Sequence, residues 1–430
     1  MRGTILATAL TLLGASCGVF KPDPADLDPI ARRYVVLSLQ MGHHDPGYID
    51  AWYGPDSLKE RAEADTLSLA GIRSAADTLI GILSDTVPAY QDSLVSMRHR
   101  YLRTQLGALV AKARMLGGEH FTFDQEAQAL YGVTPPTLPD SHFDSLLSRL
   151  DALVPGTGPL AQRYQRFRAR VEIPSALIDT VFRTAIAACR ARTMAHMALP
   201  EGERFDLEYV TGTSWNAYNW YQGGYRSLIQ VNLDFPIAVD RAIDLACHEG
   251  YPGHHVYNAS LEQHLVNERG WVELSVYPLF SPQSLIAEGT ANYGIDMAFP
   301  GEARTAFERD SLFPLAGIDP ALAEQNAAVR EVMTALNHAR NEVARQYLDG
   351  SIDSATAVAA MGRYWLQDTA QAAKTLRFVE QYRSYVINYN LGRDRAEAFV
   401  EGEGEGGGTE AGRWRAFERL LSTPRLPGDL

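Results

Sequence analysis

The segment "DLACHEGYPGHHVYN", residues 244–258, places three of the chain's eleven histidines and one glutamate within eight positions. Two histidines four residues apart on an α-helix face the same side and can bind one metal ion. Here His248 has no such partner, because Pro252 occupies the fourth position after it and is followed by Gly253. Two helix-breaking residues therefore stand inside a segment that otherwise has the composition of a metal-binding helix.

A regular helix cannot bring these histidines together. In an unbroken α-helix, His254 would lie on roughly the opposite side from His248, and His255 would lie about 10 Å farther along the axis. Nitrogen ligands of one zinc ion lie only about 3.3 Å apart. Pro252 offers no N–H to the carbonyl of His248 and its ring clashes with that carbonyl, while Gly253 accepts unusual dihedral angles. We therefore expect a bulge or kink that loops out two residues and returns His254 beside His248.

These residues predict a catalytic Zn²⁺ site. His248 and His254 are the expected ligands, although His255 competes with His254 for the second place. If His255 is not a ligand, we expect it beside the ligands or on the substrate side of the site, with a part in catalysis. Glu249 follows the first ligand and is expected to act as the general base for a water at the fourth zinc position.

The complete pattern H-E-x-x-P-G-H-H resembles that of the bacterial proteins called domain of unknown function 885. These look like distant relatives of the gluzincin metallopeptidases, which are helical enzymes that hold zinc with two histidines and one glutamate. The segment "AEGTANYG", residues 287–294, is similar to the E-G-W-A-x-Y helix of the family, with Thr290 in place of the usual tryptophan. The resemblance extends loosely from about residue 30 to the C-terminus and implies Glu288 as the third ligand.

A C-terminal Y-x-x-G element of the family is matched by Tyr389 to Gly392. The resemblance implies that the phenol of Tyr389 points into the site and helps catalysis. Tyr382 and Tyr385 recur with Tyr389 at helical spacing. This spacing is equally typical of aromatic residues that pack in a core, which is the alternative for all three. By sequence position alone, three other glutamates compete with Glu288 for the metal; they are Glu262, Glu268 and Glu273.

The rest of the chain shows mainly helical periodicity, with apolar residues three and four apart. Expected helices lie within 57–83, 93–116, 173–199, 237–265, 302–348, 353–366 and 369–400. Residues 224–236 instead alternate apolar and polar side chains, which predicts a strand directly before the histidines. We therefore expect a mainly α fold, a large gluzincin-like helical body with a small β-sheet whose edge strand lies near the zinc helix.

The N-terminus, "MRGTILATALTLLGASCG", has the layout of a secretory signal. Small residues precede Cys17 as in a bacterial lipobox, so residues 1–17 are expected to direct export and lipidation of Cys17. Residues 18–29 then form a tether to the membrane, and 30–430 form one helical domain, with 30–200 and 201–430 as two lobes that flank a cleft. The expected location is a membrane-anchored lipoprotein on the periplasmic or cell-surface side.

The formal net charge of −13 argues against a nucleic-acid partner, which requires clustered basic residues. The expected function is zinc-dependent hydrolysis of peptide bonds in short or unfolded peptides, by an oligopeptidase or a carboxypeptidase-like enzyme. One alternative is a surface lipoprotein that uses a degenerate or structural metal site as a binding module. Another is a zinc amidase or esterase that acts on cell-wall material. The sequence leaves the cleavage end and the oligomeric state open.

Overall fold

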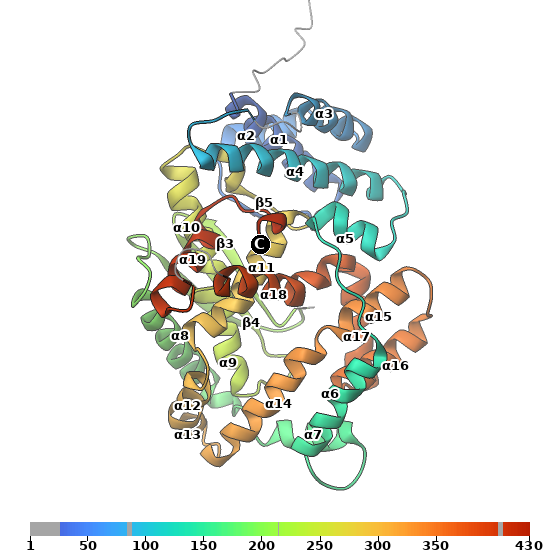
Figure 1. Ribbon diagram of the computed structural model, residues 1–430, viewed down its shortest axis with the longest axis vertical. Coiled ribbons are helices and arrows are strands. Elements are labelled where there is room, and N and C mark those ends of the chain that lie inside the picture. Colours follow the sequence, from blue (N-terminus) through green and yellow to red (C-terminus); the bar gives the residue numbers. More distant parts are fainter. Residues whose placement is uncertain (1–25, 84–87, 214, 403–406) are drawn as a thin grey trace, which may run out of the picture.

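The computed structural model describes residues 26–83, 88–213, 215–402 and 407–430 (Figure 1). The expected signal, Cys17 and most of the expected tether lie outside the described residues. Within the described part of the chain, each helix is too short or too polar to cross a bilayer. The division into two lobes at residue 200 stays a prediction.

The fold is mainly helical, as expected from the periodicity. The α-helices are α1 (Asp28–His44), α2 (Asp56–Ala64), α3 (Leu69–Ile82), α4 (Ser93–Leu116), α5 (Phe123–Tyr131), α6 (Asp140–Leu153), α7 (Leu160–Ala169), α8 (Ile178–Met194), α9 (Asp240–Leu245), α10 (His254–Leu261), α11 (Pro282–Ala298), α12 (Ala303–Phe307), α13 (Phe313–Leu315), α14 (Ala323–Leu336), α15 (Ala339–Leu348), α16 (Ser354–Trp365), α17 (Thr369–Tyr382), α18 (Ile387–Glu401) and α19 (Glu410–Ser422). Short 3₁₀ or π segments are η1 (Ser175–Leu177), η2 (Ala246–Gly250), η3 (Glu262–Asn267), η4 (Val272–Ser275), η5 (Glu308–Leu312), η6 (Pro320–Leu322), η7 (Arg383–Val386) and η8 (Pro427–Asp429).

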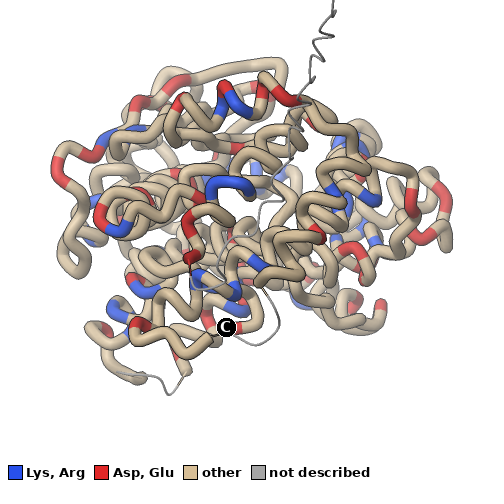
Figure 2. Tube along the Cα trace, turned by 90° about the horizontal axis from the view of Figure 1, so that it is seen from above, with Lys and Arg blue, Asp and Glu red and all other residues tan. Residues whose placement is uncertain are grey.

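The helices surround a central pair, α11 and α18, which lie side by side (Figure 1). Helices α1 to α4 lie at one end, where Figure 1 shows the N-terminal part of the chain in blue. Helices α8, α9, α12 and α13 lie on the opposite side of the molecule from α6, α7 and α15 to α17, and α14 runs between the two groups, in contact with both α12 and α6. Figure 2 shows acidic and basic residues interspersed along the chain trace.

Several expected helices are shorter than predicted. The α4 helix coincides with the expected range 93–116, but 302–348 is divided into several pieces and 369–400 is divided into α17 and α18. Local periodicity does not detect these corners, because apolar spacing continues across them while the backbone turns.

A three-stranded sheet lies beside the expected zinc helix. Its strands are β2 (Arg204–Val210), β3 (Ala217–Gly223) and β4 (Arg226–Asn232), in the order β2-β4-β3. The strand expected at 224–236 is β4, but it is the central strand, parallel to β2 and antiparallel to β3. The edge strand next to the helix is β3, whose Asn219 Nδ2 donates to the backbone oxygen of Glu249 at 2.7 Å. Strand order is a non-local property, so alternation within one segment could not reveal it.

A second, two-stranded sheet joins distant parts of the chain. Strand β1 (Ile49–Trp52) pairs antiparallel with β5 (Val276–Pro278), just before α11.

A disulfide between Cys189 and Cys247, whose Cα atoms are 5.8 Å apart, ties α8 to η2. The histidine segment is therefore held from two sides, by the β3 strand and by a covalent bond.

The central helices approach each other through two glycines. A Cβ atom on Gly289 of α11 would lie 2.4 Å from the backbone oxygen of Gly392 in α18. A Cβ atom on Gly392 would lie 2.7 Å from the backbone oxygen of Leu285. Both distances are below any contact that real side chains make, so the two helices can be this close only without side chains at these positions. Gly289 of "EGTANYG" and Gly392 of "YNLG" thus share one structural role.

We predict opposite effects for two glycine substitutions within helices. Gly289→Ala should lower the free energy of unfolding by about 1–3 kcal/mol, because the methyl group forces α11 and α18 apart. Gly107→Ala is the matched control, since Gly107 lies inside α4 with open space around its missing side chain. This change should raise stability by about 0.5–1 kcal/mol through helix propensity. Urea denaturation would measure both, and a Gly289→Ala protein as stable as wild type would contradict the packing argument.

Candidate metal centre

The chain breaks its helix at the place where Pro252 and Gly253 stand. Helix α9 passes into the π segment η2, and α10 starts again at His254. The N–H of Gly253 bonds the carbonyl of Cys247 at 2.9 Å, six residues back instead of the four of an α-helix. Two residues are therefore looped out, as the sequence led us to expect.

Gly253 is required here because of space. A Cβ atom on Gly253 would lie 1.9 Å from the backbone oxygen of His248 and 2.4 Å from that of Cys247. The φ and ψ angles of Gly253 are −78° and −136°, a combination outside the helical and extended regions that other residues occupy. The unusual dihedral angles agree with the sequence argument, and the lack of space for a side chain is a second requirement that the sequence did not show.

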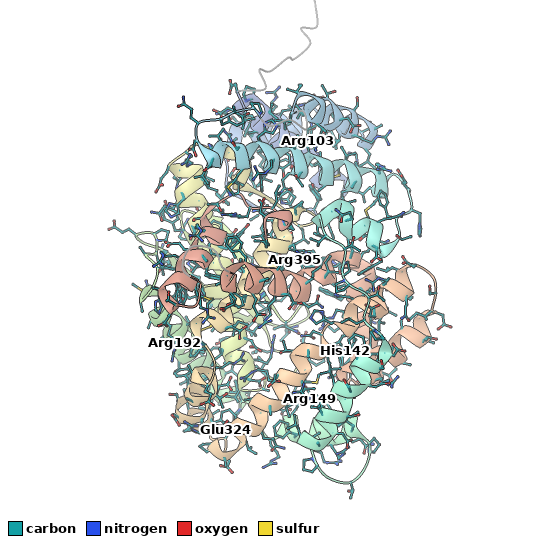
Figure 3. The ribbon with its side chains drawn as sticks, viewed as in Figure 1. Arg103, His142, Arg149, Arg192, Glu324 and Arg395 are labelled. Carbon is teal, nitrogen blue, oxygen red and sulfur yellow. A yellow bond between two sulfur atoms is a disulfide. The ribbon has the colours of Figure 1, made fainter. Side chains whose placement is uncertain are left out.

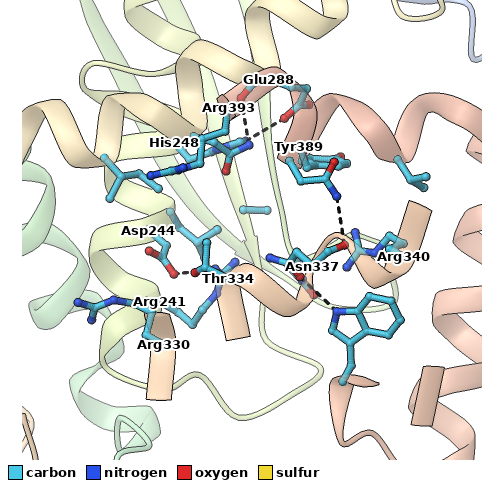
Figure 4. Close-up of a pocket in the computed structure, with 18 of the residues that line it drawn as sticks. Arg241, Asp244, His248, Glu288, Arg330, Thr334, Asn337, Arg340, Tyr389 and Arg393 are labelled. Carbon is cyan, nitrogen blue, oxygen red and sulfur yellow. Dashed lines mark hydrogen bonds and ion pairs between the residues drawn. The ribbon is translucent and has the colours of Figure 1, made fainter. Parts of the chain in front are cut away.

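The break brings the expected ligands together. Ligand atoms of His248, Glu249 and His254 all lie within 4.8 Å of one another. The two imidazole rings are perpendicular, with centroids 4.7 Å apart. Oε2 of Glu288, on α11, lies 3.3 Å from Nε2 of His248 and 3.7 Å from Nε2 of His254. Figure 4 shows Glu288 facing His248 across a dashed contact.

These residues fit a zinc ion. Oε1 of Glu288 accepts a hydrogen bond from the Tyr385 hydroxyl at 2.7 Å, but no donor among the described residues forms a hydrogen bond with the buried Oε2. A buried carboxylate oxygen without a donor is costly unless a cation binds it. Two imidazoles and one carboxylate form a common zinc donor set, and ligand atoms of a tetrahedral zinc site lie about 3.3–3.5 Å apart. His248, His254 and Glu288 would therefore hold the ion.

The electrostatics of the centre favour a cation. Burial alone would raise the pKa of Glu288, but His254 and His248 outweigh burial and hold the pKa well below its usual range. Burial alone would lower the pKa of His254, yet Glu288 and then Glu249 raise it to about 9. The carboxylates thus hold positive charge on the ring, and a divalent ion would replace that proton.

The three rival glutamates have other partners. Glu262 accepts hydrogen bonds from the Tyr221 hydroxyl and from backbone N–H groups of the β3–β4 turn. Glu273 forms a buried ion pair with Arg98 at 2.6 Å. Glu268 is a surface residue near His264. Among these candidates only Glu288 approaches the two histidines, because α11 crosses directly against η2.

His255 does not join the centre. Its ring is fully buried, with Nδ1 2.9 Å from Oγ of Ser227 and Nε2 2.9 Å from Oε2 of Glu203. Both nitrogens therefore have protein partners on the side of the sheet, and His255 does not line the cavity described below. The expectation of a catalytic or ligating His255 is not supported by this position. The residue instead fixes the first turn of α10, so that the preceding His254 faces the other way.

Two tyrosines of one segment reach the site from α18 and the turn before it. Tyr385 bonds Glu288 directly, a role that the sequence did not distinguish from core packing. Tyr389 lies one turn later, in ring contact with Tyr385 at 5.7 Å. Burial and then the negative charge of Glu288 raise the pKa of Tyr389 well above its usual value. Its phenol therefore stays protonated and able to donate at neutral pH.

Asp50 of β1 is a residue that sequence reasoning missed. Its carboxylate accepts a hydrogen bond from the hydroxyl of Tyr218, and both residues line the same cavity as the two expected histidine ligands. Burial raises the pKa of Asp50 to about 6, opposed by the Tyr218 hydrogen bond and by His254. No local motif marks it, because β1 is placed near the site only by pairing with β5 in another part of the chain.

The centre opens into one large cavity of about 1680 Å³. Its wall near the ligands includes the edge strand β3 through Ala217, Tyr218 and Asn219. At its far end it is lined by His142 of α6 and Glu324 of α14, which Figure 3 labels. Segments from the first and second halves of the chain thus form the walls together.

No protein-family model matches the chain, and no curated protein matches its sequence. Among solved structures, a protein described as "the putative lipoprotein from Colwellia psychrerythraea" is 14% identical, with a TM-score of 0.50 over 84% of this chain and 71% of that one. An M32 carboxypeptidase from Deinococcus radiodurans R1 is 13% identical, with a TM-score of 0.36 over 92% of this chain and 89% of that one. The first likeness shows a shared helical fold.

We predict that zinc affinity depends on His254 and not on nearby histidines. His254→Ala should lower the affinity at least about 100-fold, since it removes a ligand and not merely a supporting residue. His264→Ala, on the exposed end of the same helical segment, is the matched control and should keep wild-type affinity. Metal analysis and competitive titration with a chelator would measure both. Equal zinc binding by the two variants would disprove the assignment.

Proposed function

We propose that this protein is a zinc-dependent peptidase in which His248, His254 and Glu288 hold the metal. The observation that carries the proposal is the buried Oε2 of Glu288, which has no hydrogen-bond donor within the described ranges and faces two imidazoles next to the carboxylate of Glu249. Three protein ligands and a nearby carboxylate at the wall of a cavity are the arrangement of a catalytic zinc site. The resemblance of "HEGYPGHH" to peptidase motifs points the same way.

When bound, zinc supplies a Lewis acid that polarises the substrate carbonyl and lowers the pKa of water. Glu249 takes one proton from the water whose oxygen bonds to the carbonyl carbon. It then delivers this proton to the amide nitrogen as the C–N bond breaks, so that one acid and one amine product leave. The backbone of Glu249 is held by Asn219, which keeps its carboxylate beside the ligands.

Tyr389 is the proposed donor to the oxyanion that develops on the carbonyl. The hydroxyl of Tyr385 is already used by Glu288, whereas Tyr389 lines the cavity and keeps its proton. A donor that is positioned before reaction stabilises developing charge without reorganisation. His255 has no part in the proposed mechanism.

The cavity suits short or unfolded peptides. Its volume of about 1680 Å³ exceeds the roughly 300–1000 Å³ of ordinary small-molecule pockets, which leaves room for several residues. Aromatic and polar side chains line it together, including Trp215, Tyr218, Phe378 and Asn292. Such a mixture fits a peptide, whose backbone is polar and whose side chains vary.

We also propose that the protein is exported and anchored through Cys17. The signal-like N-terminus supports this, and the Cys189–Cys247 disulfide suits an oxidising compartment. The similar fold of a protein described as a lipoprotein agrees with it. The same likeness supports the second candidate function, a surface lipoprotein that binds a ligand without catalysis.

We predict that Glu249→Gln separates the two candidates. The variant should keep zinc, because Glu249 is not among the three ligands, but lose about 10²- to 10⁴-fold in the rate of peptide hydrolysis. Digestion of a mixed peptide library, followed by mass spectrometry, would measure the rate, with cell-wall fragments as a parallel substrate. Glu268→Gln, on the surface nearby, is the control and should keep full activity. Unchanged function in Glu249→Gln would favour the binding module.

A further inference from the structure

The cavity contains basic side chains of two kinds. In the part of the chain that the structure describes, five arginines that line it form ion pairs with carboxylates. They are Arg168, Arg241, Arg304, Arg330 and Arg393, paired with Asp240, Asp244, Asp244, Glu308 and Asp296 respectively. Arg340 and Lys374 also line the cavity, and the described residues offer neither of them a carboxylate partner.

The two remaining cations differ in how far their charge is compensated. Nζ of Lys374 lies 3.4 Å from the backbone oxygen of Thr213 and 4.6 Å from the centre of the Phe235 ring. Arg340 lies over the ring of Trp365 at 5.6 Å, and its Nε, shielded from solvent, has no hydrogen-bond partner among the described residues. Of the cavity cations without a carboxylate partner in the described part of the chain, Arg340 is thus the one whose Nε also lacks an acceptor there.

Partial burial makes this situation costly. Arg340 stands in the first turn of α15, directly after α14, and its backbone N–H already bonds the carbonyl of Asn337. Desolvation lowers the pKa of the Arg340 side chain below its usual value. An anion bound at this position would offset the desolvation, because it would pair with the guanidinium.

Arg340 and the candidate metal centre lie on either side of Tyr389. Figure 4 shows Arg340, Tyr389, Glu288 and His248 around the same hollow, with Tyr389 between Glu288 and Arg340. The charges of Glu288 and Arg340 act on the Tyr389 phenol in opposite directions, so both lie near it. When the scissile carbonyl of a bound peptide lies beside Tyr389 and the proposed ligands, the residues that follow the scissile bond therefore lie close to Arg340.

We propose that Arg340 binds the C-terminal carboxylate of the substrate, so that the enzyme removes residues from the carboxyl end of peptides. This inference rests on the proposed peptidase function and names its substrate class. A guanidinium matches a carboxylate with two parallel hydrogen bonds, and every unmodified peptide carries that group at one end. Arg340 is a specificity-determining residue, since it holds the substrate and takes no part in bond cleavage.

The test compares matched peptides. A library of N-acetyl tripeptides would be offered as free acids and as C-terminal amides, with a third set of amides that carry Asp or Glu side chains. Wild type should hydrolyse the free acids with a kcat/KM about 100-fold above that of either amide set, as expected for a charged hydrogen-bonded pair. Arg340→Gln should bring this ratio close to one, and Arg340→Lys should restore part of it. Lys374→Gln, at the other unpaired cation, should leave the ratio at its wild-type value.

A binding measurement keeps this inference distinct from the proposed reaction. Calorimetry with Glu249→Gln protein should show about 100-fold tighter binding of free acids than of amides, lost again on adding Arg340→Gln. Hydrolysis that depends on Glu249 but treats acids and amides equally would overturn the role of Arg340 and leave the peptidase proposal intact. Preference for amides with acidic side chains would assign Arg340 to side-chain recognition and overturn the inference. Equal binding of all three sets, with or without Arg340, would do the same.

Discussion

The contact between Gly253 and the carbonyl oxygens of Cys247 and His248 is the constraint on which the site depends. No side chain fits at residue 253, and the N–H of Gly253 bonds a carbonyl six residues back. This hydrogen bond satisfies a backbone acceptor that a proline-broken helix would otherwise leave open. It also brings the imidazole of His254 next to that of His248, whereas a continuous helix would hold the two rings apart.

Two neighbouring features keep that break in place. The disulfide from α8 holds Cys247, directly before the first histidine, and the buried His255 ties the first turn of α10 to Ser227 and Glu203. His254 and His255 are adjacent in sequence but face opposite ways, one toward the cavity and one toward the sheet. The function of the first therefore depends on the burial of the second, although only the first would touch a metal.

The proposed third ligand is positioned by a separate packing contact. Gly289 and Gly392 let α11 and α18 approach closely, which places Glu288 beside the histidines and Tyr385 beside Glu288. One carboxylate oxygen then accepts a hydrogen bond from the tyrosine, and the other, without a donor among the described residues, is the one proposed to bind the metal. The same approach carries Tyr389 to the cavity wall, near Arg340. The groups proposed for catalysis and substrate binding thus depend on a contact between two glycines that have no chemistry of their own.

The sequence by itself determined the helical class, the place of the helix break and the residues that compete for the metal. Periodicity, and the inability of proline to continue a helix, are local properties that can be read from neighbouring residues. Only the tertiary structure decided that β4 is central, that His255 turns away, that Tyr385 bonds Glu288, and that Asp50 and Arg340 line the cavity. Each of these depends on segments far apart in the chain, and such pairings arise from packing and burial that no single segment encodes.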